Sequence, residues 1–381
     1  MNKFILILIV FTFSKAGAQT SALAVADSLY AVGDYSQAIE TLERTQPKTE
    51  QVYLKLARAF QAKGNLKEAG TYYEIVLIKN PERILTKIDH AQLLMKIGEL
   101  NKADSIFSRL AKDYPKNAGF QYQLGLIKEQ QQDSTASIYF KNTIQLEPKH
   151  QDALFKLAKD ELQLREYGMA TNYSLMGLSA NPGNVSLRSV LAQSYYNQKF
   201  YDKAIPEFEK IVELGQGNEF VHSRLGFSYY QLTDFLSAID HYKKALIFDD
   251  KNSDTHYNLG KLYAITGDLK KSEIHLLMAV LIKKQPVDAE FLSLGLTYKL
   301  QKNHKKALEY FNSALKENPE NERALYERAI AADNYFKDFE TRINYYVVYL
   351  NKFEAEGNED LIYLTKTRLK DLRKDQHLLE E

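Results

Sequence analysis

The stretch Phe291–Pro319, FLSLGLTYKLQKNHKKALEYFNSALKENP, decides the fold of this chain. Its apolar residues recur at helical spacing on both sides of a polar run, QKNHKK, which predicts two helices joined by a turn. Gly295 lies in the first helix and Ala307 in the second, and Phe311 follows Ala307 one turn later. Small residues at such places allow two helices to cross at short distance. The stretch therefore predicts a helical hairpin.

The same pattern recurs ten times with a period close to 34 residues. Position eight of every copy is Gly or Ala: Ala26, Ala57, Ala91, Gly125, Ala158, Ala192, Gly226, Gly260, Gly295 and Ala329. Position twenty is nearly as uniform, with Ala38, Ala69, Ala103, Ala136, Ala170, Ala204, Ala238, Ser272, Ala307 and Thr341. Gly inside a helix costs about 1 kcal/mol relative to Ala, so its recurrence at one position indicates a packing requirement.

Large and turn-forming residues complete the repeat. Position twenty-four carries an aromatic ring in most copies: Tyr73, Phe107, Phe140, Phe208, Tyr242, Phe311 and Tyr345. Breaks occur within copies at Gly33, Gly64, Gly98 and Gly267, and between copies at Pro81, Pro115, Pro148, Pro182 and Pro319. Pro206 falls early in a second helix, where we expect a local distortion.

We therefore expect an all-α fold, an α-solenoid of about ten helical hairpins in residues 19–350. The expected hairpins are 19–49, 50–83, 84–117, 118–150, 151–184, 185–218, 219–252, 253–287, 288–321 and 322–351. Residues 352–381 are predicted to form a capping helix and tail, because the last hairpin would otherwise expose its stacking face. Its pattern places Leu361, Leu364, Leu369 and Leu372 inward and Lys366, Arg368, Lys370, Arg373 and Lys374 outward. The basic residues read as a solvated surface, with a lipid or nucleic-acid patch as the alternative.

The repeat resembles the tetratricopeptide repeat family, through Phe291, Leu294, Gly295, Tyr298, Ala307, Phe311, Ala314 and Pro319. The resemblance covers residues 19 to about 350 and implies a right-handed superhelix whose first helices line a concave, protein-binding groove. On this basis the groove residues are Tyr122, Phe155, Lys159, Gln193, Tyr196, Phe220, Arg224, Phe227, Tyr230, Tyr257, Lys261 and Leu296, with Leu54 and Tyr326 at corresponding positions.

An aromatic groove with separated cations suits a peptide that carries apolar anchors and occasional acids. The alternative is that the rings only pack adjacent first helices. Family members that clamp a chaperone's C-terminal carboxylate use Lys at position five, and no copy here has it. Arg224 and Asn258 stand at position six of their copies.

The first residues predict export. Lys3 precedes the apolar run Phe4–Phe13, and Ala16, Gly17 and Ala18 form a cleavage site, so residues 1–18 read as a signal peptide. An uncleaved membrane anchor is the alternative, although the run is about half of the roughly 20 residues that span a bilayer. We expect no later membrane span, and a location in the periplasm, with secretion as the second possibility. The chain has no cysteine, which excludes disulfides and thiolate chemistry. Its net charge of +1 gives no indication of nucleic-acid binding.

No motif for catalysis or for a cofactor was found, so we expect neither an enzyme nor a cofactor site. His222 and His256 share position four of neighbouring copies, where packing is expected and a metal pair is the alternative. Asp27-Ser28-Leu29, Asp104-Ser105-Ile106 and Asp133-Ser134-Thr135 resemble bacterial O-glycosylation acceptors but also fit plain helix positions. The leading hypothesis is a scaffold that binds proteins or peptides of the bacterial cell envelope. The alternatives are a self-assembling structural protein and an enzyme acting on cell-wall glycans, and the oligomeric state is left open.

Overall fold

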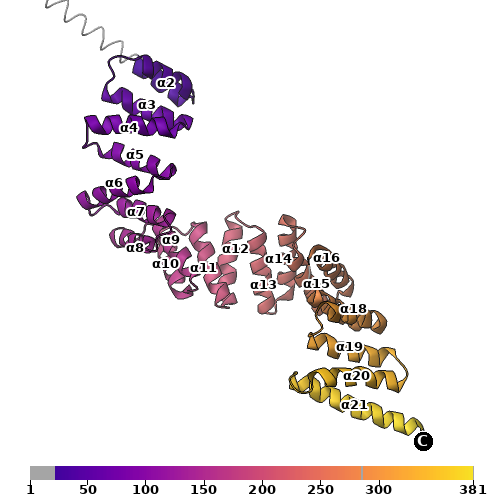
Figure 1. Ribbon diagram of the computed structural model, residues 1–381. Helices are drawn as coiled ribbons and strands as arrows, with labels where there is room; N and C mark the ends of the chain where they lie inside the picture. Colours follow the sequence, from indigo (N-terminus) through magenta and orange to yellow (C-terminus); the bar gives the residue numbers. More distant parts are fainter. Residues whose placement is uncertain (1–21, 285, 381) are drawn as a thin grey trace, which may run out of the picture. The chain divides into compact units, whose positions relative to one another are not determined.

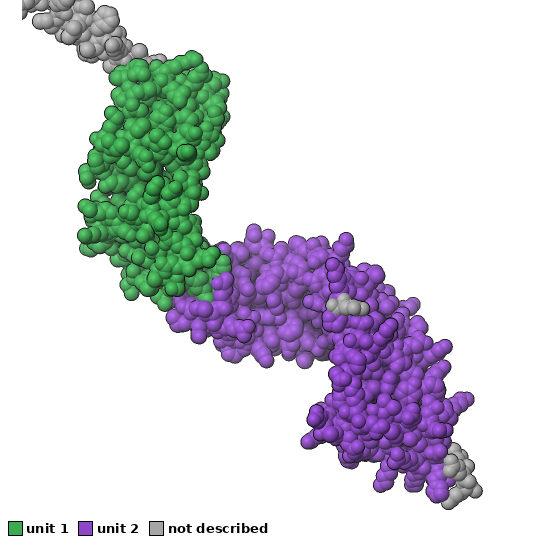
Figure 2. Space-filling model, viewed as in Figure 1, with its two compact units in different colours: residues 1–160, 179–181 green, residues 161–178, 182–381 purple. Residues whose placement is uncertain are grey.

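The computed structural model describes residues 22–284 and 286–380. The expected signal peptide, residues 1–18, lies outside them. Two compact units divide the chain: unit 1 is Met1–Asp160 with Ser179–Asn181, and unit 2 is Glu161–Leu178 with Pro182–Glu381 (Figure 2).

All regular structure in the described residues is helical, and residues 22–31 form the first described helix (Figure 1). The helices that follow are α2 (Tyr35–Arg44), α3 (Glu50–Lys63), α4 (Leu66–Lys79), α5 (Ile84–Lys96), α6 (Leu100–Asp113), α7 (Ala118–Gln130), α8 (Ala136–Leu146), α9 (Gln151–Gln163), α10 (Tyr167–Ala180), α11 (Val185–Asn197), α12 (Tyr201–Glu213), α13 (Glu219–Gln231), α14 (Phe235–Phe248), α15 (Ser253–Thr266), α16 (Leu269–Ile282), α17 (Asp288–Leu300), α18 (His304–Glu317), α19 (Glu322–Tyr335), α20 (Phe339–Phe353) and α21 (Glu359–Glu380).

From α2 to α8 and from α11 to α21, each helix packs against its neighbour in sequence, and the first helix α17 also contacts the first helices α15 and α19. This pattern of neighbour contacts is that of an α-solenoid, so the predicted all-α solenoid of helical hairpins is confirmed. Between residues 22 and 380, Gln285 aside, no helix has both the length and the apolar character needed to cross a bilayer.

The small residues lie where two helices of a hairpin cross. A β-carbon added to Gly295 would come within 2.4 Å of Phe311 Cε1, and one added to Gly125 within 2.5 Å of Phe140 Cε1. Both rings are fully buried. The ring at position twenty-four thus occupies the space that the small residue at position eight leaves free, as the repeat pattern predicts.

The turn inside every hairpin but the last uses a left-handed residue at position fifteen. Gly33, Gly64, Gly98 and Gly267 have φ between 81° and 91° there. The same position is left-handed without glycine in five further copies, at Gln132, Arg165, Lys199, Thr233 and Lys302. In the tenth copy Phe336 has φ −85°. The hairpin geometry therefore dictates this conformation even where the residue type disfavours it.

Helix α21 covers the end of unit 2, as expected of a cap. Leu369 and Leu372 are buried against Ala329 of α19 and Tyr346 of α20. Two of the orientations predicted for α21 are wrong: Leu364 is exposed, and Arg368 turns inward.

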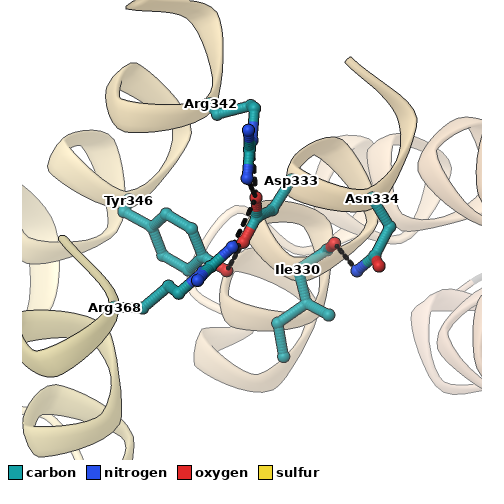
Figure 3. Close-up of polar contacts among 6 residues, drawn as sticks. All are labelled: Ile330, Asp333, Asn334, Arg342, Tyr346 and Arg368. Carbon is teal, nitrogen blue, oxygen red and sulfur yellow. Dashed lines mark hydrogen bonds and ion pairs between the residues drawn. The ribbon is translucent and has the colours of Figure 1, made fainter. Parts of the chain in front are cut away.

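Arg368 turns inward because a buried carboxylate binds it. Arg368 Nε donates to Asp333 Oδ2 at 2.7 Å, and Arg342 Nε donates to Asp333 Oδ1 at 2.7 Å (Figure 3). Tyr346 donates its hydroxyl to the same carboxylate at 3.1 Å (Figure 3). Burial alone raises the pKa of Asp333, but the hydrogen bonds from the two arginines outweigh burial and leave that pKa below its usual range. One carboxylate on α19 therefore binds side chains of both α20 and α21.

Two local predictions also need correction. In α20 the buried residues are Tyr346 and Tyr349, whereas Thr341 and Tyr345 are half-buried. Helix α19 runs one position further in its copy than α17 does, so α20 begins one position later than α18. Helix α12 continues through Pro206 from Tyr201 to Glu213, so the proline does not interrupt it.

Candidate functional site

The first helices of unit 2 form a recess of about 270 Å³ on their shared face. Its walls come from α11, α13 and α15, with one ring from α14: Tyr196, Glu219, Phe220, Ser223, Arg224, Phe227, Tyr242, Asn252, Asp254, Thr255 and Asn258. The helical period places Phe220, Arg224 and Phe227 on one side of α13, so that three side chains reach the same recess. This volume has room for about one side chain of a ligand.

Arg224 is the central cation of this recess. Its guanidinium lies over Tyr196 at 4.6 Å and over Phe220 at 5.1 Å from the ring centroids. Its Nη1 donates to the Tyr196 hydroxyl at 2.9 Å. Among the described residues, Arg224 has no carboxylate partner. The rings fix the guanidinium in place while its charge stays unpaired.

Lys261 of α15 repeats this arrangement one copy further along. Its ammonium lies 5.2 Å from the Tyr257 ring centroid and 5.5 Å from that of Tyr230. No ion pair to Lys261 occurs in the described part of the chain. Lys261 also borders a second, more apolar recess of about 380 Å³, formed with Ala264, Ile265, Leu276, Ser293, Leu296, Thr297, Lys299 and Leu300.

The recess around Arg224 also contains acidic residues, and these do not neutralise the arginine. Glu219 accepts hydrogen bonds from Ser223 Oγ at 2.7 Å and from Asn252 Nδ2 at 3.0 Å. Asp254 lies in the first turn of α15 and is exposed. The polar groups beside Arg224 are therefore largely committed to one another, which leaves the guanidinium as the group available to an anion.

Rings on adjacent first helices also contact each other. The ring centroids of Tyr196 on α11 and Phe227 on α13 lie 5.6 Å apart. Both side chains are half-buried: they pack neighbouring helices and still present a face to the recess.

The remaining predicted groove residues behave differently. Gln193 uses its amide on Ser189 of its own helix, at 3.1 Å from the backbone oxygen. In unit 1, Tyr122 packs against His150 at 4.8 Å, and burial with nearby carboxylates raises the pKa of its hydroxyl to about 12. Phe155 is half-buried and Lys159 exposed on α9.

For two further residues the predicted groove position is wrong. Leu54 and Tyr326 are buried, with 7% and 9% of their surface exposed, so neither lines an open groove. Each belongs to a hydrophobic core cluster of its own unit, where its side chain packs between helices.

The histidines form pairs that sequence spacing did not predict. His222 contacts His241 with 3.1 Å between their Nδ1 atoms, and His256 contacts His275 with 3.0 Å. Each pair joins the two helices of one hairpin. His241 and His275 are one repeat apart, as His222 and His256 are, and this shared spacing was the signal in the sequence that could have revealed the pairs. Burial lowers the pKa of both His241 and His275 to about 4. No cluster of three or more metal-ligating side chains occurs among the described residues.

Comparisons with known proteins support the repeat assignment. Sequence models of the tetratricopeptide repeat match residues 23–84, 89–117 and 289–321. These three segments of the chain are thus recognised as tetratricopeptide repeats. No curated protein sequence matches it.

Among solved structures, the chain resembles the C-terminal part of a tetratricopeptide repeat protein from Cytophaga hutchinsonii, with 18% identity, a TM-score of 0.54 and coverage of 62% of this chain and 99% of that one. It also matches YrrB, titled a repeat protein with an unusual peptide-binding site (19% identity, TM-score 0.46, coverage 49% and 96%). A repeat protein from Parabacteroides merdae matches with 17% identity, a TM-score of 0.43 and coverage of 65% and 98%. At these identities the likeness describes the fold alone.

Proposed function

We propose that this chain is an exported, periplasmic scaffold that binds an extended segment of a cell-envelope protein along the first-helix face of unit 2. Tetratricopeptide repeats generally act as protein-interaction scaffolds, and we propose a binding role without catalysis. The observation that carries the proposal is the pair Arg224 and Lys261, two cations that each rest on two aromatic rings and lack a carboxylate partner in the described part of the chain.

A half-buried cation without a counter-charge favours an anionic ligand. A ligand carboxylate would gain charge-assisted hydrogen bonds from Arg224, whose planar guanidinium is already oriented by Tyr196. The recess beside Leu296 and Leu300 is mainly aliphatic and would take an apolar side chain of the same ligand. The proposed ligand is therefore a peptide with a carboxylate and an apolar anchor.

The test is crosslinking in cells with photoreactive residues at positions 196, 227 and 257, and at the exposed outer positions Lys243 and Lys316 as matched controls. We expect adducts to one or a few envelope proteins from the three groove positions, and their loss when Arg224→Gln and Lys261→Gln are combined. Adducts only from the outer positions would contradict the groove. Fractionation of the cells would test the periplasmic location separately.

A further inference from the structure

The outer face of α16 is apolar although it faces solvent. Ile274, Leu277 and Leu281 are 58%, 41% and 78% exposed. On its inner face the helix buries Leu276 and Ala279 completely. A surface helix normally carries polar residues on its outer side, so an apolar outer face indicates that another surface covers it.

The repeat supplies an internal comparison. Ser272 of α16 and Ala307 of α18 are the equivalent small residues, both fully buried. Counted from them, the positions of Ile274, Leu277 and Leu281 are held in α18 by Glu309, Asn312 and Lys316. The hairpin therefore does not require apolar residues at these positions.

Lysines stand at both ends of this face. Lys270 and Lys284 are exposed and form no ion pair with any residue that the structure describes, whereas Lys271 pairs with Asp268 and Lys283 with Glu290. Twelve residues of helix, about 18 Å, separate Lys270 from Ile282, the last residue of α16, and Lys284 follows two residues later. The outer face of α16 thus has an aliphatic middle and an unpaired positive charge at each end.

We propose that the outer face of α16 docks an amphipathic helix of a partner protein, with acidic residues near both ends of the contact. The spacing of Ile274, Leu277 and Leu281, three and then four residues, is that of a helix-to-helix seam. Carboxylates about 14 residues apart on the partner helix would face the two lysines. This surface lies on α16 and is separate from the recesses around Arg224 and Lys261, so it does not depend on the function proposed above.

Two other occupants fit less well. A second copy of the chain packed α16 against α16 would bring Lys270 or Lys284 against a lysine of the other copy in either orientation, which costs energy through like-charge repulsion. A bilayer with anionic lipids would cover more than one helix, and the neighbouring outer helices present exposed carboxylates: Asp240, paired with Lys244, on α14 and Glu309 on α18. Only a single helix along α16 avoids both conflicts.

The test uses the full chain and two fluorescein-labelled 18-residue helical peptides, with leucines at the same seam spacing and two flanking residues 14 positions apart. The flanking residues are Glu in one peptide and Lys in its twin. Fluorescence anisotropy should show that the Glu peptide binds at least about tenfold more tightly than the Lys peptide, because two opposite-charge contacts replace two like-charge contacts.

Two variants make the test specific. I274E/L277N/L281K transfers the residues of α18 to α16, so it should keep the thermal stability of the chain and weaken the Glu peptide at least about tenfold. K270E/K284E should reverse the preference between the two peptides. The variant R224Q/K261Q, which alters only the groove, should leave the binding of both peptides unchanged.

Several results would overturn the proposal. Equal binding of the two peptides, or unchanged binding to I274E/L277N/L281K, would exclude the acidic helix. Sedimentation of the chain with vesicles of phosphatidylethanolamine and phosphatidylglycerol at 3:1, abolished by the same triple variant, would assign the face to a bilayer. Dimerisation in analytical ultracentrifugation, abolished by that variant, would assign it to a second copy.

Discussion

Gly295→Ala separates two opposite expectations for a single methyl group. Helix propensity alone predicts that Ala stabilises the interior of α17 by about 1 kcal/mol. The structure predicts the reverse, because the new β-carbon would lie 2.4 Å from Phe311 Cε1 and 2.5 Å from Cδ1, more than 1 Å short of ordinary contact. Phe311 is fully buried and cannot swing into solvent. Overpacking of this kind costs about 1–3 kcal/mol, so we expect a net loss of about 1–2 kcal/mol.

The assay is urea unfolding followed by circular dichroism, with hydrogen exchange in α17 and α18 as a local readout because repeat arrays unfold in segments. Gly168→Ala in the first turn of α10 is the control: nothing lies within 4 Å of its added β-carbon, and it should be neutral or slightly stabilising. The double variant Gly295→Ala/Phe311→Leu should show a favourable coupling of about 1 kcal/mol or more. If Gly295→Ala stabilises the protein, or if the coupling is absent, close approach of the helices is not the reason why small residues recur at this position along the chain.

Three further predictions concern other parts of unit 2. Asp333→Asn should lower the free energy of unfolding by about 2 kcal/mol and increase hydrogen exchange in α21, because the Asp333 side chain is only 7% exposed and binds two arginines. The control is Glu320→Gln in the exposed ion pair with Lys352, which should change the free energy of unfolding by less than about 0.5 kcal/mol. Thr233→Gly should raise the melting temperature, since a β-branched residue at φ 62° costs about 1 kcal/mol, and a lower melting temperature would show that the turn is not strained. His241 and His275 have pKa values of about 4 in the folded chain and about 6.5 in the unfolded chain, so the folded state binds fewer protons between these pH values. The free energy of unfolding should therefore fall as the pH drops from about 6.5 to about 4. Replacing both histidines with Phe should flatten the plot of urea midpoint against pH in this range, and an unchanged slope would show that these two histidines do not cause it.

The sequence predicted the parts of the fold that depend on side-chain size. Small residues at position eight and rings at position twenty-four identify the crossing of the two helices, because no larger pair fits there. The turn was predicted only where glycine marks it. At Thr233 and Lys199 the same left-handed conformation follows from the geometry of the hairpin, and residue type gave no indication of it. Likewise, the inward turn of Arg368 depends on Asp333, 35 residues earlier, and helical periodicity describes only one helix at a time.

The candidate site, too, could be predicted only in part from the sequence. Repeat positions placed the rings of Tyr196 and Phe227 on one face, since that face follows from the period alone. What gives the recess its chemistry is that no carboxylate of the described residues pairs with Arg224, although Glu219 and Asp254 lie in the same recess. A missing partner can be recognised only when every neighbour is placed. Glu219 illustrates the point: by sequence it stands five residues before Arg224 and could have neutralised it, yet Ser223 and Asn252 hold its carboxylate. Under the two proposals made above, the unpaired charges of Arg224, Lys261, Lys270 and Lys284 would select the ligands of this chain.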